Sequence, residues 1–276
     1  MEKGLKVTNI DYGPGVGSIM VPRNMSNGTV KSDQTLLDLL DVLNEGRLMG
    51  VTEISDELGV SKSAAHKHLK TLAENGYVIN EGGKYKLSLK LLELGASIRS
   101  NHDLCGQARP IIRELADETN ELVAFSVEQS GWSVFVYTVN DRYGLVENLP
   151  LIGSHCYMHQ NAAGKAMIAE LSDEAIAEIV RTRGLPGATE NSITTESELQ
   201  DEIAEIRDQD YAVSFGERSD ALRSVGVSIT VPESDLLGAV SIAGPAKRLS
   251  RADLTEEYAP KIQAEVNDLE LQLRYE

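Results

Sequence analysis

The 276-residue sequence predicts an α+β protein with two domains, a winged helix-turn-helix followed by a larger mixed α/β domain. Three observations lead to this fold class. The stretch Val51–Lys86 has the pattern of helix, tight turn, helix and two-stranded hairpin. Strand and helix patterns then alternate as far as the C-terminus. The length suits two domains rather than one. We expect a mobile tail over 1–30, the winged helix-turn-helix over 31–88, a linker helix over 89–105 and the α/β domain over 106–276.

Two amphipathic helices are expected first. One begins near Ser32 or Asp33, ends at Gly46 and buries a leucine stripe consisting of Leu36, Leu39, Leu40 and Leu43. The next buries Val51, Ile54 and Leu58. Together they form the support that a helix-turn-helix needs to bury its apolar face.

A third helix has the pattern of a DNA-reading helix. Gly59 suits the left-handed C-cap before it, and Ser61 suits its N-cap. Its inner face carries Ala65, Leu69 and Leu72, with His68 expected at the boundary of the core. Short donors on the outer face suit base edges, and lysines there and on the hairpin around Gly82–Gly83 suit phosphates. The predicted DNA contacts are Ser61, Lys62, Ser63, His66, Lys67, Lys70, Lys84 and Lys86.

Leu89–Ser100 is an apolar helix that we expect to link the domains and pack against a second subunit, with a helix inside one domain as the alternative. An amphipathic helix over Gly106–Glu118 follows. Beyond it, strands are predicted at 122–128, 133–139, 211–215, 225–231 and 237–243, and helices at 161–171, 173–183, 196–209 and 251–273. This order indicates a sensor domain with an antiparallel sheet.

The net charge of −17 lies entirely outside the DNA-reading segment. Residues 1–100 carry 12 basic and 12 acidic side chains, whereas residues 101–276 carry 14 and 31. A basic face can therefore meet DNA while an acidic body stays away from it. Such acidity with only 12 lysines favours a salt-adapted, haloarchaeal source over an ordinary acidic protein.

Other features narrow the protein class. Cys105 and Cys156 are too few for a disulfide framework, no apolar run spans a membrane, and no secretory signal is evident, so a cytoplasmic protein is expected. Met20 and Met25 are alternative starts to Met1. Motifs of hydrolases and metalloproteases are missing, which argues against an enzyme, and no cofactor is expected.

Several segments together resemble the IclR family of transcription regulators. They are SKSAAHKHLKTLAENGYV, GGKYKLSLKLLELG, HQNAAGKA, GLPGATENSIT, ALRSVGVSI and GAVSIAGPAKRL, in this order along residues 32–274. The resemblance implies a GAF-like effector domain behind the winged helix, in a homodimer or tetramer that binds double-stranded operator DNA. It also implies a small-molecule effector, often a carboxylate or sugar acid.

By motif position, the resemblance implies an effector pocket made of Ala162, Ala163, Ser214, Leu222, Ser224 and Ser241. Backbone N–H groups at a helix start would receive an oxyanion there. This chain departs from the family pattern, since Ser214 replaces a frequent aspartate, Ser224 a frequent cysteine, Ala243 a second serine and Ser228 a proline. Such a neutral, hydroxyl-lined pocket favours a polyhydroxylated sugar acid.

Two weaker candidates lie nearby. Lys165 could neutralise a carboxylate, although a helix lysine is more often solvated. His155, Cys156 and His159 could ligate zinc, but a fourth ligand is not identifiable, so packing roles are favoured and no metal is predicted. The sequence as a whole predicts a DNA-binding regulator controlled by an effector; the alternative is a small-molecule sensor or scaffold that no longer binds DNA.

Overall fold

The computed structural model describes residues 30–44, 46–139, 152–231 and 236–275. The chain divides into two compact units, with the boundary between Asn101 and His102. The tail expected over residues 1–29 and the alternative starts at Met20 and Met25 lie outside the described residues.

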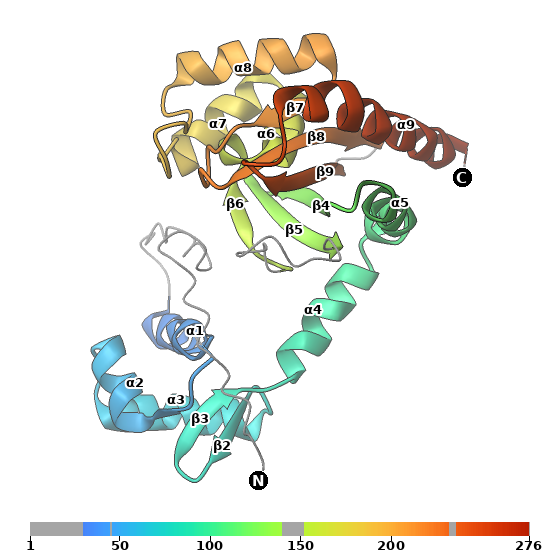
Figure 1. Cartoon of the computed structure of the whole chain (residues 1–276). Helices are drawn as coiled ribbons and strands as arrows, with labels where there is room; N and C mark the ends of the chain where they lie inside the picture. Colours follow the sequence, from blue (N-terminus) through green and yellow to red (C-terminus); the bar gives the residue numbers. More distant parts are fainter. Residues whose placement is uncertain (1–29, 45, 140–151, 232–235, 276) are drawn as a thin grey trace, which may run out of the picture. The chain divides into compact units, whose positions relative to one another are not determined.

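The N-terminal unit has the winged helix-turn-helix order (Figure 1). Its small sheet has the strand order β1-β3-β2, with antiparallel neighbours. Strand β1 was not expected, because two residues are too short to carry a strand pattern. The elements are α1 (Lys31–Leu43), β1 (Met49–Gly50), α2 (Val51–Leu58), α3 (Lys62–Glu74), β2 (Val78–Glu81), β3 (Lys84–Leu87) and α4 (Lys90–Ser100).

Local sequence explains the geometry of α2 and α3. Gly59 closes α2 in the left-handed conformation at φ +63°, which costs glycine little. The Ser61 hydroxyl accepts from the Ala64 N–H at 3.2 Å and caps α3. The expected inner residues of α3 are all buried. They join Leu39, Leu43, Ile54 and Tyr85 in one core.

Helix α4 differs from the other helices of this unit. None of its residues is buried in the single chain. Leu92 is 66% exposed and Ile98 73% exposed. An apolar helix surface of this kind is typical of a protein contact.

The C-terminal unit is built on a six-stranded sheet of order β6-β5-β4-β9-β8-β7, in which all neighbours are antiparallel. Its elements are α5 (Asp103–Thr119), β4 (Leu122–Gln129), β5 (Trp132–Val139), β6 (His155–Tyr157), η1 (Met158–Gln160), α6 (Ala162–Ala169), α7 (Asp173–Arg183), α8 (Glu196–Gln209), β7 (Ala212–Ser214), β8 (Leu222–Thr230), β9 (Leu237–Pro245), η2 (Asp253–Tyr258) and α9 (Ala259–Tyr275).

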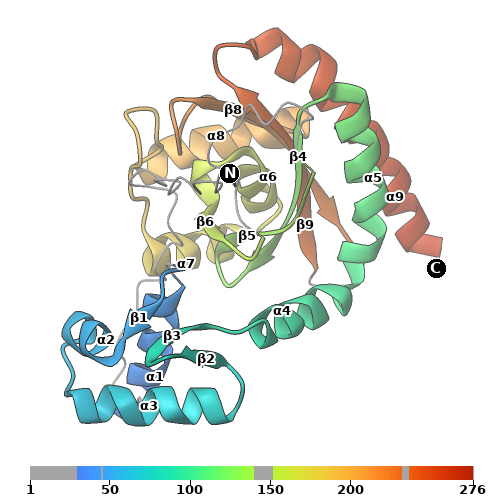
Figure 2. The ribbon, with the colours of Figure 1, turned by 60° about the horizontal axis from the view of Figure 1, so that its bottom comes forward.

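Helices cover both faces of this sheet. Figures 1 and 2 show α5 and α9 along one face and α6 along the other, with α7 and α8 outside α6. The large apolar residues of β4, β5, β8 and β9 pack against α5 and α9 in the main core. The opposite face carries small residues, including Ala212, Ala239 and Gly226. That small-residue face holds α6.

Several elements of the C-terminal unit differ from the expected ones. Strand β6 was missed, since it has three residues and no alternation long enough to recognise. The expected helix over 251–273 begins instead with the π-helical turn η2 before α9. Helix α6 ends at Ala169, two residues earlier than expected. No helix in the described part of the chain is long and apolar enough to cross a membrane.

Candidate functional site

The predicted DNA contacts lie on one helix and one hairpin of the N-terminal unit. Ser61 to Lys70 supply the exposed side of α3, and Lys84 lies exposed at the start of β3. Lys86 is half-buried, with its ammonium 2.5 Å from a Glu81 oxygen. His68 is half-buried beside the core. The sequence thus separates correctly the buried and the exposed faces of α3.

Four of the six predicted effector residues lie on the small-residue face of the large sheet: Ser214, Leu222, Ser224 and Ser241. Ser214 lies opposite Ser224, and Ser224 lies opposite Ala243. One row further along, Gly226 lies opposite Ser241. Because side chains two residues apart share a strand face, Leu222, Ser224 and Gly226 point the same way. The sheet register therefore brings together serines from three strands.

Helix α6 begins over Gly226, which lies opposite Ser241. A Cβ atom on Gly226 would lie 2.8 Å from the Ala162 carbonyl carbon and the Ala163 nitrogen. A Cβ atom on Gly164 would lie 2.3 Å from the Met158 carbonyl oxygen. Only glycine allows these two close approaches, to β8 on one side and to η1 on the other.

The start of α6 presents two backbone donors. The first N–H groups of any helix lack acceptors within the helix. Here the Asn161 side chain accepts from the Gly164 N–H at 2.8 Å, which leaves the N–H groups of Ala162 and Ala163 without an intrahelical partner. Both residues are buried. Such donors at the positive end of the helix dipole suit an oxyanion.

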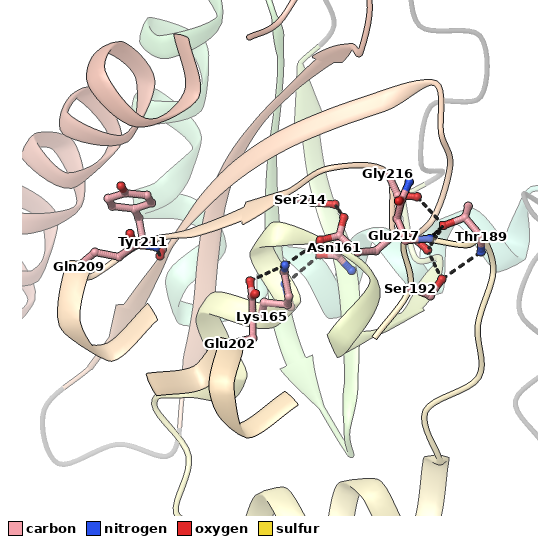
Figure 3. Close-up of polar contacts among 12 residues, drawn as sticks. Asn161, Lys165, Thr189, Ser192, Glu202, Gln209, Tyr211, Ser214, Gly216 and Glu217 are labelled. Carbon is pink, nitrogen blue, oxygen red and sulfur yellow. Dashed lines mark hydrogen bonds and ion pairs between the residues drawn. The ribbon is translucent and has the colours of Figure 1, made fainter. Parts of the chain in front are cut away.

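Lys165 corrects the expectation of a solvated side chain. It is only 2% exposed, and its ammonium lies 2.6 Å from a Glu202 oxygen and 2.8 Å from a Glu217 oxygen (Figure 3). Burial of a lysine requires such partners. All eight residues of α6 are buried, so no side of this helix could leave Lys165 in water. The apolar sequence AAGKAMIA, with no polar face, was the available signal.

Glu217 also contacts Ser214, and the sequence offered no sign of this pairing. The Ser214 hydroxyl donates to the second oxygen of the Glu217 carboxylate (Figure 3). Both residues are buried. Glu217 follows β7 in a turn, and Glu202 lies on α8. Two separate parts of the unit, α8 and the turn after β7, thus converge on Lys165.

The residues considered as zinc ligands have other partners. His155 Nδ1 lies 3.0 Å from the Gly153 carbonyl oxygen, and His159 Nε2 lies 3.1 Å from the Pro186 carbonyl oxygen. Cys156 is buried against the Arg218 guanidinium, and its burial raises the pKa of its thiol to about 11. Among the described residues, no three His, Cys, Asp or Glu side chains form a group that could hold a metal ion.

Comparisons with known proteins cover nearly the whole chain. The family model described as "Bacterial transcriptional regulator IclR C-terminal" matches residues 96–271, and the "IclR helix-turn-helix domain" matches residues 36–81. The regulator KdgR of Dickeya chrysanthemi is 29% identical over 249 residues, which are 90% of this chain and 81% of KdgR. A Halobacterium salinarum protein with the name "Probable HTH-type transcriptional regulator ArcR" is 26% identical over 264 residues, which are 92% of this chain and 99% of ArcR.

The crystal structure of the Thermotoga maritima IclR has the same fold. Its TM-score is 0.74 at 23% sequence identity, over 88% of this chain and 98% of that one. The chain belongs to the IclR family of transcription regulators, with a DNA-binding helix-turn-helix domain and a C-terminal ligand-binding domain.

Proposed function

We propose that this regulator binds operator DNA with an affinity set by a small carboxylate or sugar acid held at the start of α6. The observation that carries the proposal is the arrangement of Ala162 and Ala163 beside the serines of the sheet. The start of α6, which has two backbone donors, packs against a sheet face that carries neutral hydroxyls. A carboxylate at the donors and hydroxyl groups along the serines would satisfy both halves of the site.

The DNA half of the proposal assigns α3 to the major groove. Ser61, Ser63 and His66 lie on its exposed side near the N-terminal end, where short side chains reach base edges. Lys62, Lys67 and Lys70 would contact phosphates, with Lys84 and Lys86 doing so from the wing. In the free protein Lys70 and Lys86 lie near Glu74 and Glu81, at 3.6 and 2.5 Å. These two lysines would exchange a carboxylate for a phosphate on binding.

The coupling half of the proposal needs a second copy of the chain. The exposed apolar residues of α4 support a homodimer or tetramer in which this helix contacts its counterpart. A symmetric dimer would read an inverted-repeat operator. The effector would then act by changing the distance between the two DNA-binding domains of the dimer. The size of this change in DNA affinity is limited by the difference between the effector's affinities for the DNA-binding and the non-binding conformation.

We place the protein in the cytoplasm, in a role without enzymatic turnover. Its membership of a family of transcription regulators supports this location, because operator DNA is there. The acidic surplus of residues 101–276 and the likeness to a Halobacterium regulator support a salt-adapted, haloarchaeal source. Because the phosphate contribution to DNA affinity falls steeply with salt concentration, contacts to bases and recognition of DNA shape would then supply a larger share of the binding free energy.

A mobility-shift assay with the DNA upstream of the protein's own gene tests the proposal. We expect a retarded complex whose affinity changes when a sugar acid is added. The Ser224→Leu protein should bind the same DNA and lose the response, because leucine would fill the space beside α6. A full response from Ser224→Leu would contradict the placement of the effector. Ligand binding without DNA binding would instead favour the alternative, a small-molecule sensor that no longer binds DNA.

A further inference from the structure

Ser214 is the serine of the proposed effector site whose hydrogen already has an acceptor. Its hydroxyl donates to Glu217. The other Glu217 oxygen lies 2.8 Å from the Lys165 ammonium, so the side chain is a carboxylate and can only accept. The single hydrogen between the two residues is therefore that of the serine. A hydroxyl has only one hydrogen, which leaves Ser214 with acceptor lone pairs alone.

Glu217 is held in this position from both sides of its backbone. The Ser192 hydroxyl donates to its carbonyl oxygen at 2.6 Å, and the Thr189 hydroxyl donates to the preceding Gly216 carbonyl oxygen at 2.7 Å (Figure 3). Gly216 has φ +98°, a conformation that other residues rarely adopt. Because Lys165 also holds the carboxylate, Glu217 has little freedom to move away from the Ser214 hydroxyl.

The site therefore has donors at one end and an acceptor at the other. The Ala162 carbonyl group and the Ala163 backbone nitrogen lie over Gly226, which is opposite Ala212 on β7. Ser214 is two residues further along β7. Such diagonal neighbours in an antiparallel sheet are about 7–8 Å apart. That separation suits a small molecule with its carboxylate at α6 and its next polar group at Ser214.

We infer that Glu217 is a positioning residue that makes Ser214 an acceptor, so that the effector must offer a hydroxyl hydrogen there. The inference rests on the proposed effector site and narrows its ligand class to hydroxy acids. A 2-oxo acid would place a carbonyl oxygen against the lone pairs of Ser214. Two acceptors facing each other leave a buried polar group unpaired, and sites that bind a hydroxyl reject analogues lacking it.

Matched acid pairs test this selectivity on the full-length protein. We would measure by calorimetry the binding of L-lactate against pyruvate and of 2-hydroxybutyrate against 2-oxobutyrate, whose oxo members keep a carbonyl group in water. The hydroxy member should bind about tenfold or more tightly than its oxo partner, the size expected for one unpaired buried acceptor.

Two isosteric variants separate the role of Glu217 from a general effect of the cluster. In Glu217→Gln the amide oxygen can still accept from Lys165 while the amide nitrogen donates to Ser214. The serine hydrogen is then available to the ligand, and the hydroxy-to-oxo affinity ratio should fall at least about tenfold. Glu202→Gln also removes a charge beside Lys165, but Glu202 does not contact Ser214 in the described structure. Its ratio should stay within about twofold of the wild type.

The possible results are distinct. An equal affinity for both members of each pair, with no change in Glu217→Gln, would overturn the inference while leaving the effector site intact. A change of the ratio in Glu202→Gln as large as in Glu217→Gln would also overturn it. Binding of none of the acids would overturn the proposed effector site itself. Since the ratio compares two ligands on the same folded protein, partial unfolding of a variant lowers both affinities and leaves the ratio unchanged.

Discussion

Helices α3 and α6 use lysine in opposite ways. Lys62, Lys67 and Lys70 lie exposed on α3, where their charges can meet a partner outside the chain. Lys165 lies buried on α6, held by two carboxylates of the same chain. One helix is amphipathic, and the other is buried on every side. The residue type is the same, and its surroundings decide whether the lysine charge is available to a binding partner or forms ion pairs inside the domain.

The comparison also distinguishes two kinds of binding surface. The α3 surface is local, because residues of one helix and one hairpin supply all of its predicted contacts. The α6 site is assembled from a helix start and strands β7, β8 and β9. Changes on the exposed side of α3 should therefore alter binding and leave stability intact, whereas changes around α6 should alter both.

The largest expected effect is that of removing the buried lysine charge. Lys165→Met keeps most of the length of the unbranched side chain but leaves Glu202 and Glu217 without their cation. The cost should be about 3–5 kcal/mol of the free energy of unfolding, as for other broken buried pairs. Urea denaturation would measure it, with Lys67→Met as the matched control expected within about 0.5 kcal/mol of the wild type. Equal stability of the two variants would contradict the contrast between the helices.

A smaller loss is expected where α6 meets the sheet. Gly226→Ala would place a methyl group 2.8 Å from the backbone of α6, so the helix must shift. Overpacking of this kind costs about 1–3 kcal/mol, and effector binding should weaken with it. Gly106→Ala, at an exposed position of α5 with no atom within 4 Å of the added carbon, should be neutral or stabilise by about 1 kcal/mol. Thermal denaturation and calorimetry would compare them, and an undisturbed Gly226→Ala protein would contradict this packing.

For the α3 surface the expected change is in DNA affinity. Lys67→Met should weaken binding to specific and unrelated DNA alike and lower the slope of log affinity against log salt by about 1. His66→Ala should instead change the preference among operator sequences. Mobility-shift titrations at several salt concentrations would separate the two. A sequence-dependent effect of Lys67→Met would assign that lysine to a base.

The smallest expected effect is a pH dependence at His159, close to the start of α6. Burial lowers the pKa of this histidine below its ordinary value of 6.5. The folded protein therefore keeps it neutral while the unfolded chain takes up a proton as the pH falls below about 6.5. The contribution of neutral His159 to the free energy of unfolding is therefore complete above that pH. It decreases as the pH falls below about 6.5, by at most about 1.4 kcal/mol per pH unit. His159→Gln should reduce this loss in denaturation measured between pH 7 and 5; an identical profile would contradict it.

The sequence predicted the N-terminal unit well because its signals are local. Apolar spacing identified the buried Ala65, Leu69 and Leu72, and the caps at Gly59 and Ser61 follow from residue chemistry at single positions. The C-terminal unit was predicted in outline. Its longer helices and strands have clear periodicity, but β6 is too short to show any. Lys165 was assigned to solvent because its carboxylate partners lie 37 and 52 residues away.

The sequence by itself determined the two-domain fold class, the exposed and buried faces of α3, and the residue types available at the start of α6. Only the tertiary structure decided that Ser224, Ser241 and Ser214 share one sheet face. It also decided that the Ser214 hydroxyl donates its hydrogen to Glu217, whose carboxylate is paired with Lys165. The reason is physical. Helix periodicity and caps depend on neighbours within a few residues, whereas strand register and a buried ion cluster depend on groups that only folding brings together.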